Sequence, residues 1–562
     1  MRSSLLAALL LAPAALPAQA FWPDEGPRTW APRPTEAAIT ANDLRTRLYQ
    51  FADDSMMGRE AGTIGNIKAT DYIAAEFRRL GLLPAGENGS YFQVVGYGPS
   101  GFDSTTLALS VAGRPVELRT GWFPLPTGMA GTENPDFDGR NVAVVFGGRW
   151  GDTTTALDPA VIAGKAVVFL LPTENPGTFF QAGDPRAAGA RVVLIAGLEA
   201  APANLATFAL RVRPTLHGRA TAGAPATAVI SLPTASALFD TPLASLAPGA
   251  PGRAVTGHWK YDQRSTEHPV RNVLAILPGA DPALRGQYVV IGAHNDHVGT
   301  APRALDHDSL RAFNTVMRPQ GANDRVSLDQ VTPAQWAEIN ALIARARATR
   351  PAEPDSIFNG ADDDGSGSMV LLEIAERMAS GERPRRSVLF NSHAAEEKGL
   401  LGSRWWTWYP TAPLDSVVAA HNMDMVGKGR VSDVRFGGPR TVQMLGSRRV
   451  SAEFGDMIDS LNAVRDEPMV IDYSWDRTNR LNRFCRSDQV NYIRAGIPTT
   501  YFSTGYSRDY HQLTDEPRYI NYDQSARVAR FVHDIALTVA NRPERLALLP
   551  PEEQDPQARC GG

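Results

Sequence analysis

Five short segments of the 562-residue chain place carboxylates or imidazoles directly after an apolar run, or in the loop that follows one. These residues offer oxygen and nitrogen ligands, and a set without sulfur suits a catalytic zinc site that keeps one position open for water. In an open α/β sheet the loops after the strands' carboxyl ends gather at one edge, so the segments can converge. Alone, they predict a metal-dependent hydrolase. The segments are residues 292–297, 359–367, 393–397, 422–425 and 510–511.

Each segment also has a simpler explanation when taken alone. The consecutive aspartates Asp362, Asp363 and Asp364 could cap the helix that follows them, because Asp favours the N-cap position. Glu396 and Glu397 could be a solvated pair of charges. The joint occurrence of all five segments in one chain favours the metal site over these separate explanations.

The same segments, in the same order, resemble the co-catalytic zinc aminopeptidases of peptidase family M28. The resemblance covers roughly residues 40–98 and 266–540, and it includes the motif Met57-Gly58-Arg59. It implies an α/β fold, an α/β/α sandwich of the zinc-exopeptidase type with a mixed, mostly parallel sheet. The section between the two parts resembles a protease-associated (PA) domain, a common insertion in this family.

The resemblance implies two Zn²⁺ ions held by five ligands. One zinc would take His294 and Asp424, and the other would take Glu397 and His511. Asp363 would bridge the two, with its neighbours in the aspartate run as the alternatives. Two zincs that share a carboxylate and a water lie about 3.5–4 Å apart and clamp the attacking and departing oxygens. The resemblance also implies a cis peptide bond after the bridging aspartate.

Three further residues would serve the reaction if the resemblance holds. Glu396 matches the general base, which takes a proton from the attacking water and later returns it to the leaving amine. Asp296 matches the carboxylate that fixes the tautomer of a ligand imidazole. Tyr510 would donate a hydrogen bond to the tetrahedral oxyanion. His297 forms an H-x-x-H spacing with His294, but the family pattern uses only the first histidine, so we expect His297 to be structural.

The chain departs from the family pattern in two places. The connection over residues 301–358 is longer than the usual loop, is polar, and is predicted to contain one helix over 333–347. It would overhang the cleft. Ser487-Asp488-Gln489 stands where many relatives have Ser-Asp-His, which leaves the local hydrogen bonding open but removes no metal ligand.

The pattern of apolar residues predicts the elements that must position these side chains. From residue 270 onward, apolar strands alternate with helices, which indicates a sheet covered on both faces. The strands expected there are 288–293, 387–390, 417–422 and 498–502. Between them, Leu371, Ile374, Ala375 and Met378 mark one face of an amphipathic helix.

The domain organisation follows from changes in composition along the chain. Short β-rich runs separated by Gly, Pro and Asp predict an inserted β-rich domain with no plausible cluster of metal ligands. The predicted parts are a signal peptide (1–20), the first part of the peptidase domain (21–99), the insertion (100–262), the main part of the peptidase domain (263–546) and a disordered tail (547–562).

Composition and the N-terminus restrict the setting. The formal net charge of −4 and the lack of any Lys/Arg-rich run argue against a nucleic-acid partner. A positive start, a short apolar run and a small-residue cleavage site predict export to the periplasm or the medium, and the run is short for a membrane span. Cys485 and Cys560 could pair, but two cysteines provide no disulfide framework.

The preferred hypothesis is an exported aminopeptidase that hydrolyses N-terminal residues of peptides. Serine-hydrolase and His-Glu-x-x-His motifs do not occur in the sequence. Three alternatives stay open: a carboxypeptidase of the glutamate-carboxypeptidase type, a receptor-like homologue without activity, and a single-zinc acyltransferase of the glutaminyl-cyclase type. The carboxypeptidase would need a cationic pocket, for which the candidates are Arg477, Arg480, Arg483 and Arg486.

Overall fold

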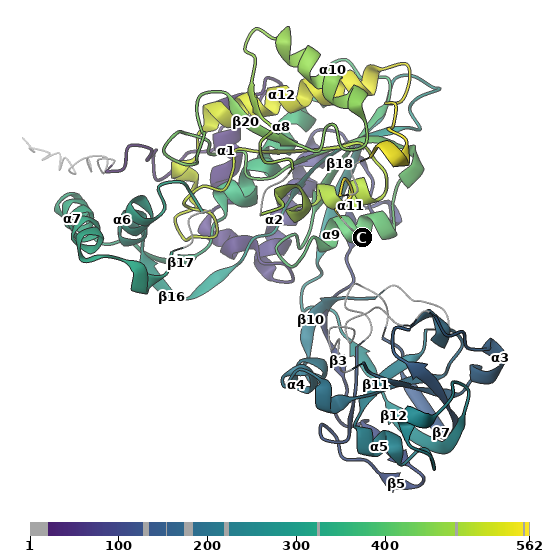
Figure 1. Ribbon diagram of the computed structural model, residues 1–562. Coiled ribbons are helices and arrows are strands. Elements are labelled where there is room, and N and C mark those ends of the chain that lie inside the picture. The colour runs from purple at the N-terminus through teal and green to yellow at the C-terminus, as the bar shows by residue number, and fades with distance from the viewer. Residues whose placement is uncertain are drawn as a thin grey trace, which may run out of the picture. The chain divides into compact units, whose positions relative to one another are not determined.

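The computed structural model describes residues 21–126, 134–152, 154–172, 184–218, 224–322, 326–477, 481–554 and 557–560 (Figure 1). The chain forms two compact units, one of Met1–Val95 with Val270–Gly562 and the other of Gly96–Pro269. The predicted signal peptide lies outside the described residues, as does Arg480. Among the described residues, no helix combines the length and the apolar character needed to cross a membrane.

A nine-stranded sheet forms the centre of the first unit. Its strands are β1 Leu83–Pro84, β2 Phe92–Val94, β14 Arg271–Leu277, β15 Tyr288–His294, β18 Ser387–His393, β19 Val417–Met423, β20 Thr441–Leu445, β21 Val470–Asp472 and β22 Thr499–Ser503. The order is β1-β14-β18-β15-β19-β22-β20-β21, and β2 pairs with β14. Strands β18, β15, β19 and β22 are parallel, whereas β14 and β20 join them antiparallel.

Helices cover both faces of this sheet (Figure 1). They are α1 Ala41–Phe51, α2 Ile64–Arg79, α8 Gly367–Ser380, α9 Leu401–Trp408, α10 Ala452–Ala463, α11 Gln489–Arg494 and α12 Tyr522–Asn541. Val289 and Ile291 of β15 pack in one core with α8 and α12, while Val290 packs on the opposite face with α9 and α11. Successive side chains of a strand point to opposite faces, so an all-apolar strand needs cover on both. The predicted α/β/α sandwich is confirmed.

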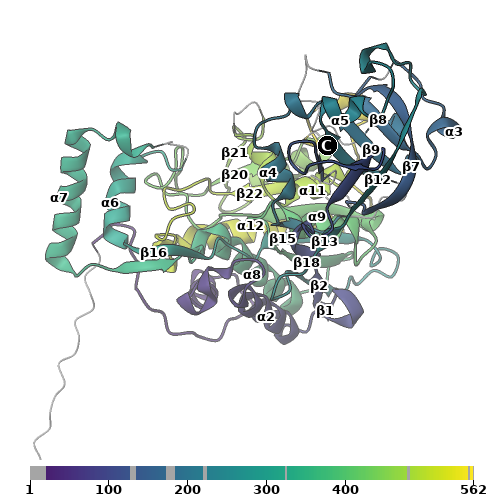
Figure 2. The same cartoon turned by 90° about the horizontal axis from the view of Figure 1, so that it is seen from below.

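The long connection after β15 has more structure than the sequence predicted. It contains β16 Thr300–Asp306, α6 His307–Met317, α7 Pro333–Thr349 and β17 Pro354–Ile357. The two strands pair antiparallel and the two helices pack side by side (Figure 2). The helix predicted over 333–347 is confirmed as α7, which starts with a capping box of Thr332 and Gln335. The ribbon and α6 were missed because β16 is largely exposed and lacks an apolar pattern.

The prediction of a disordered tail is wrong for the described residues after 546. Cys485 and Cys560 form a disulfide, and Ala558 is buried. The amide of Leu549 donates to the carbonyl of Val450 at 2.8 Å. The polar composition suggested disorder, but the covalent link and these main-chain contacts hold the segment against the first unit.

The second unit is β-rich and has its own cores. An eight-stranded sheet has the order β5-β4-β12-β7-β8-β9-β11-β6, and a three-stranded sheet has the order β10-β3-β13. The strands are β3 Tyr97–Phe102, β4 Ala108–Val111, β5 Arg114–Pro115, β6 Trp122–Pro124, β7 Phe137–Arg149, β8 Ala166–Leu170, β9 Val192–Ala196, β10 Arg213–Leu216, β11 Ala226–Ile230, β12 Pro251–Trp259 and β13 Tyr261–Gln263. The helices are α3 Pro159–Ile162, α4 Leu205–Leu210 and α5 Leu232–Ser236. Its likeness to a PA domain stays a prediction.

Candidate active site

The five predicted ligands lie in loops at the carboxyl ends of the parallel strands. His294 is the last residue of β15, and Asp424 directly follows β19. Glu397 lies in the turn after β18, Asp363 lies just before α8, and His511 lies in the loop after β22. Because these strands are neighbours in the sheet and run in the same direction, their ends meet at one edge.

Asp363 lies at the centre of the group, and each of its carboxylate oxygens faces a different imidazole. Its Oδ1 is 3.1 Å from Nε2 of His294, and its Oδ2 is 3.0 Å from Nε2 of His511. The residue is only 3% exposed. The peptide bond between Asp363 and Asp364 is cis, as the resemblance implied.

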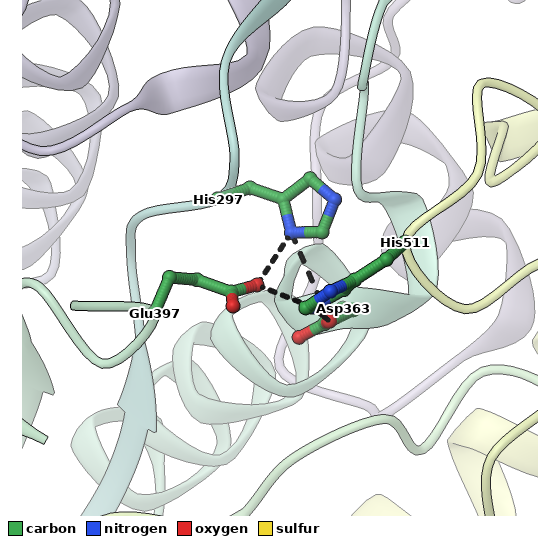
Figure 3. Close-up of side chains that lie close together, drawn as sticks. All are labelled: His297, Asp363, Glu397 and His511. Carbon is green, nitrogen blue, oxygen red and sulfur yellow. Dashed lines mark hydrogen bonds and ion pairs between the residues drawn. The ribbon is translucent and has the colours of Figure 1, made fainter. Parts of the chain in front are cut away.

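Three side chains, those of His297, Glu397 and His511, surround Oδ2 of Asp363 (Figure 3). Oε1 of Glu397 lies 3.0 Å from Nε2 of His511 and 3.0 Å from Nδ1 of His297. His297 is fully buried, and its Nδ1 is 3.8 Å from Asp363. The sequence predicts a structural place for His297, despite its H-x-x-H spacing with His294. The structure brings it into contact with the predicted ligands.

A second group of potential ligands surrounds His294. Oδ1 of Asp424 lies 3.7 Å from Nε2 of His294, and Asp364 lies within the same cluster. The carboxylate of Asp364, however, accepts main-chain N–H groups from three segments. These are the amides of His294 at 3.0 Å, Gly367 at 2.9 Å and Met425 at 3.2 Å. Asp364 therefore joins the strand ends to the start of α8.

The first member of the aspartate run also serves the main chain. Oδ1 of Asp362 accepts the amide of Gly427 at 2.7 Å and the hydroxyl of Ser366 at 3.2 Å. Asp362 and Asp364 were the alternatives for the bridging position. Of the three aspartates, Asp363 is the one whose two oxygens face two imidazoles.

A buried arginine holds the loop that carries Asp363. Arg59 is 0% exposed and donates from Nη1 to the carbonyl of Asn359 at 2.5 Å and from Nη2 to that of Gly360 at 2.8 Å. Burial lowers the pKa of Arg59 to about 10, with Asp515 and other nearby carboxylates acting against the shift. Gly58 must lack a side chain, because a Cβ there would lie 2.1 Å from the carbonyl oxygen of Gly299. These contacts account for the Met57-Gly58-Arg59 motif.

Asp296 organises the segment that contains Glu396. Its Oδ1 accepts the amide of Glu396 at 2.9 Å, and its Oδ2 accepts the amide of Glu397 at 3.4 Å. Nδ1 of His294 lies 3.1 Å from the main-chain oxygen of Asp296 and 3.6 Å from its Oδ1. The imidazole is thus oriented mainly by the main chain of Asp296, while the carboxylate holds the neighbouring turn.

Glu396 is half-buried, and its carboxylate has no hydrogen bond to any described residue. Burial raises the pKa of Glu396 well above its ordinary value. The negative charges of Asp424 and Glu397 act in the same direction, whereas His294 acts against it. A carboxyl group with a raised pKa and no fixed partner can exchange a proton with a substrate or a water.

Part of the chain matches a known protein family. Residues 344–536 match the model of peptidase family M28. This part of the chain is similar to peptidase family M28. The matched range includes Asp363, Glu397, Asp424 and His511, whereas His294 precedes it.

Named peptidases are among the proteins that this chain resembles. A probable leucine aminopeptidase of Trichophyton verrucosum (strain HKI 0517) is 32% identical over 113 residues, which are 19% of this chain and 32% of that protein. A probable zinc metalloprotease of Pyrenophora tritici-repentis (strain Pt-1C-BFP) is 24% identical over 228 residues, 35% of this chain and 52% of that protein. The chain thus spans about a third of the first relative and about half of the second. A zinc aminopeptidase from Bacillus subtilis has a similar structure at 17% identity and a TM-score of 0.41, over 90% of this chain and 96% of that chain.

The charges in the cluster stabilise one another. Burial acts against a charge on His511, yet the neighbouring carboxylates of Asp363 and Glu397 raise its pKa to about 10. Burial also acts against the charge on Asp363, but the neighbouring imidazoles of His294 and His511 hold its pKa well below the ordinary value.

The donor atoms of the site fit a metal ion. The buried atoms without a hydrogen-bond partner of good geometry in the described part of the chain include His294 Nε2, His297 Nδ1, Asp363 Oδ2 and Asp424 Oδ1. Buried polar atoms are rarely left without a partner, and here they converge on one another. Imidazole and carboxylate donors are those that catalytic zinc sites use.

Tyr510 and Gln489 are two further neighbours of the site. Tyr510 stacks on the ring of His511, with centroids 3.9 Å apart, and no hydrogen bond of its hydroxyl to a described residue is present. Gln489, the departure from Ser-Asp-His, accepts the side-chain amide of Asn422 at 3.0 Å and donates to the carbonyl of Phe484 at 2.6 Å. Both the oxygen and the nitrogen of the Gln489 side chain are therefore hydrogen-bonded.

Proposed function

We propose that this protein is an exported aminopeptidase with two zinc ions, which hydrolyses N-terminal residues of peptides. The observation that carries the proposal is Asp363, whose two oxygens face His294 on one side and His511 on the other. A carboxylate that serves two imidazole-containing groups is the arrangement required to bridge two metals.

In this proposal the two groups of side chains each hold one zinc. His294 and Asp424 would hold the first, Glu397 and His511 would hold the second, and Asp363 would be shared by both. When bound, such a pair polarises a carbonyl group and lowers the pKa of a water molecule.

The chain's own groups perform the proton transfers. Glu396 accepts a proton from the attacking water and returns it to the nitrogen of the leaving amine, for which its raised pKa is suited. Asp296 keeps Glu396 in place through its amide. Nδ1 of His297 lies 3.0 Å from Oε1 of Glu397 and restricts the position of that carboxylate. Tyr510 supplies a hydroxyl donor to the developing oxyanion.

The test is turnover of aminoacyl anilides by the wild type and by Glu396→Gln, with zinc content measured on the same samples. Loss of a general base lowers kcat by about 10²–10⁴-fold. We expect that loss with the zinc content unchanged, and no effect of the matched control Glu382→Gln, which changes an exposed glutamate. Equal turnover by wild type and Glu396→Gln would remove Glu396 from the mechanism.

Substrates with a blocked N-terminus separate the proposal from the carboxypeptidase alternative. An aminopeptidase should cleave a free aminoacyl peptide and leave its N-acetylated form intact, because the free α-amine takes part in binding. Cleavage of the N-acetylated peptide from its carboxyl end would favour the carboxypeptidase. Export is supported by the N-terminal sequence pattern, and N-terminal sequencing of protein from the periplasm or the medium tests it, with cleavage expected near Ala20.

A further inference from the structure

A stack of aromatic rings leads from the metal site to an arginine. The ring of Tyr510 lies 3.9 Å from that of His511, at an interplanar angle of 23°. The ring of Tyr506 lies 4.8 Å from that of Tyr510, at 10°. Two guanidinium groups rest on Tyr506: that of Arg483 at 4.4 Å and that of Arg486 at 5.3 Å from the ring centroid.

The two arginines differ in what remains of their binding capacity. Arg483 is 2% exposed, donates to Oε1 of Gln443 at 2.7 Å and stacks on Trp475 at 3.7 Å. It therefore serves the interior of the domain. Arg486 is exposed, and no residue in the described part of the chain accepts a hydrogen bond from it or forms an ion pair with it.

Arg486 is also within the electrostatic field of the reaction centre. Burial acts to lower the pKa of Arg486, but Tyr506, Tyr510 and other neighbours raise it above the ordinary value, and Glu396 is among them. The guanidinium is thus an open cation that lies near the proposed general base and is held against a ring of the stack.

We propose that Arg486 binds a carboxylate of the substrate next to the scissile bond, so that the enzyme prefers peptides with an acidic group there. This inference rests on the proposed peptidase function and names its substrate class. The planar guanidinium suits a carboxylate because it can donate two parallel N–H bonds. Its contact with Tyr506 restricts the orientation of that plane.

The reach of the arginine limits which carboxylate it can bind. Two ring-to-ring contacts and one contact between a ring and a guanidinium group separate Arg486 from His511. An extended peptide advances about 3.3–3.6 Å per residue. The carboxylate must then belong to the side chain of the first or second residue of the peptide, or to the free C-terminus of a dipeptide. These sources share one chemistry and differ in the substrate that shows it.

The test measures kcat/KM for three matched pairs of substrates: Glu and Gln anilides, Leu-Glu-amide and Leu-Gln-amide, and Leu-Leu and Leu-Leu-amide. We expect the wild type to prefer the charged member of one pair, and that pair identifies the source of the carboxylate. Arg486→Gln should lower kcat/KM for that member by about tenfold or more, as expected for one charge-assisted hydrogen bond. Arg486→Glu should reverse the preference.

The neutral substrates provide the control for folding and for the proposed function. Their kcat/KM should stay within about twofold in Arg486→Gln, because they have no carboxylate with which Arg486 could form a hydrogen bond. The matched control is Arg78→Gln, which alters an exposed arginine that rests on the ring of Tyr91 at 5.4 Å near the end of α2.

Two results would overturn the inference, and they are distinguishable. Turnover of the neutral substrates with the same charged-to-neutral ratio in wild type and Arg486→Gln would remove Arg486 as a specificity determinant and leave the proposed function intact. Failure of the zinc-loaded wild type to cleave any of the six substrates would overturn the proposed function and this inference together.

Discussion

The carboxylate of Asp515 accepts the main-chain amide of Asp363 at 3.1 Å. It also accepts the amide of Asp362 with both oxygens, at 3.0 Å each. Asp515 lies only four residues after His511, so this contact connects two of the proposed ligand segments directly. A substitution of Asp515 should therefore alter metal binding at the proposed site.

Asp515→Asn should weaken zinc binding. The amide side chain keeps the shape but replaces one accepting oxygen by a donor, which faces the N–H groups of the Asp363 loop. Loss of such supporting contacts typically costs about 10–100-fold in metal affinity. Competition with a chelating dye measures the affinity. The control is Asp262→Asn, an exposed aspartate of the second unit, and an unchanged zinc affinity in Asp515→Asn would contradict the linkage.

Arg59→Met should destabilise the fold as well as the site. The substitution removes the donors to the carbonyls of Asn359 and Gly360, and the carbonyl of Gly360 keeps only the amide of Gly365 at 3.1 Å. A hydrogen bond to a charged group contributes about 1.5–3 kcal/mol, so the loss of two should lower the free energy of unfolding by about 3 kcal/mol or more. Denaturant unfolding measures this value. Arg303→Met, at an exposed position of β16, should change it by less than about 0.5 kcal/mol. Similar values for both variants would show that Arg59 does not hold this loop.

Asp308 of α6 holds the connection over residues 301–358 in place. Its carboxylate accepts hydrogen bonds from Arg350 at 2.5 Å, Arg347 at 2.8 Å and the indole of Trp22 at 2.9 Å. Burial alone would raise the pKa of Asp308, but these hydrogen bonds lower it below the ordinary value. Because the pKa is lower in the folded state, the carboxylate stabilises the fold above about pH 3.9, the unfolded value, and this contribution is lost as the pH falls below it.

Asp308→Asn should therefore lower stability near neutral pH and matter less in acid. Breaking a buried ion pair costs about 3–5 kcal/mol at neutral pH. The difference in free energy of unfolding between wild type and Asp308→Asn should shrink between pH 7 and pH 3, measured by denaturant unfolding at both values. A difference that is constant across this range would rule out the charge of Asp308 as its source.

His297→Gln tests the one cluster member that the sequence analysis set aside. If Nδ1 of His297 orients Glu397, its loss should weaken zinc binding by about 10–100-fold without altering the neutral-pH fold. The matched control is His258→Gln in the second unit, whose imidazole is partly exposed. Unchanged metal affinity, measured by dye competition, would return His297 to a purely structural place.

The candidate ligands could be predicted from the sequence because their segments resemble those of family M28, and several of them follow strands that are recognisable as apolar runs. His294 ends β15 and Asp424 follows β19, so local pattern and sheet geometry together bring them to one edge. The role of His297 could not be predicted, since an H-x-x-H spacing fits a buried structural histidine equally well. The contact between His297 and Glu397 brings His297 into the cluster, and these two residues are far apart in the sequence.

The supporting contacts could not be predicted for the same reason. Arg59 is 300 residues from Asn359, and Asp515 is 152 residues from Asp363. No local periodicity encodes pairs at such separations. The ordered tail was missed because its composition resembles a disordered segment, whereas the disulfide to Cys485 depends on the folded position of both cysteines.

Asp363 is proposed to bridge two metal ions, and the number of zinc ions bound per chain tests this proposal. Protein saturated with zinc and freed of excess should be analysed by plasma mass spectrometry for the wild type and for Asp363→Ala. We predict two zinc ions per chain in the wild type and fewer than one in Asp363→Ala, because both sites lose a ligand. One zinc ion per wild-type chain, or two zinc ions retained by Asp363→Ala, would show that Asp363 does not bridge two zinc ions.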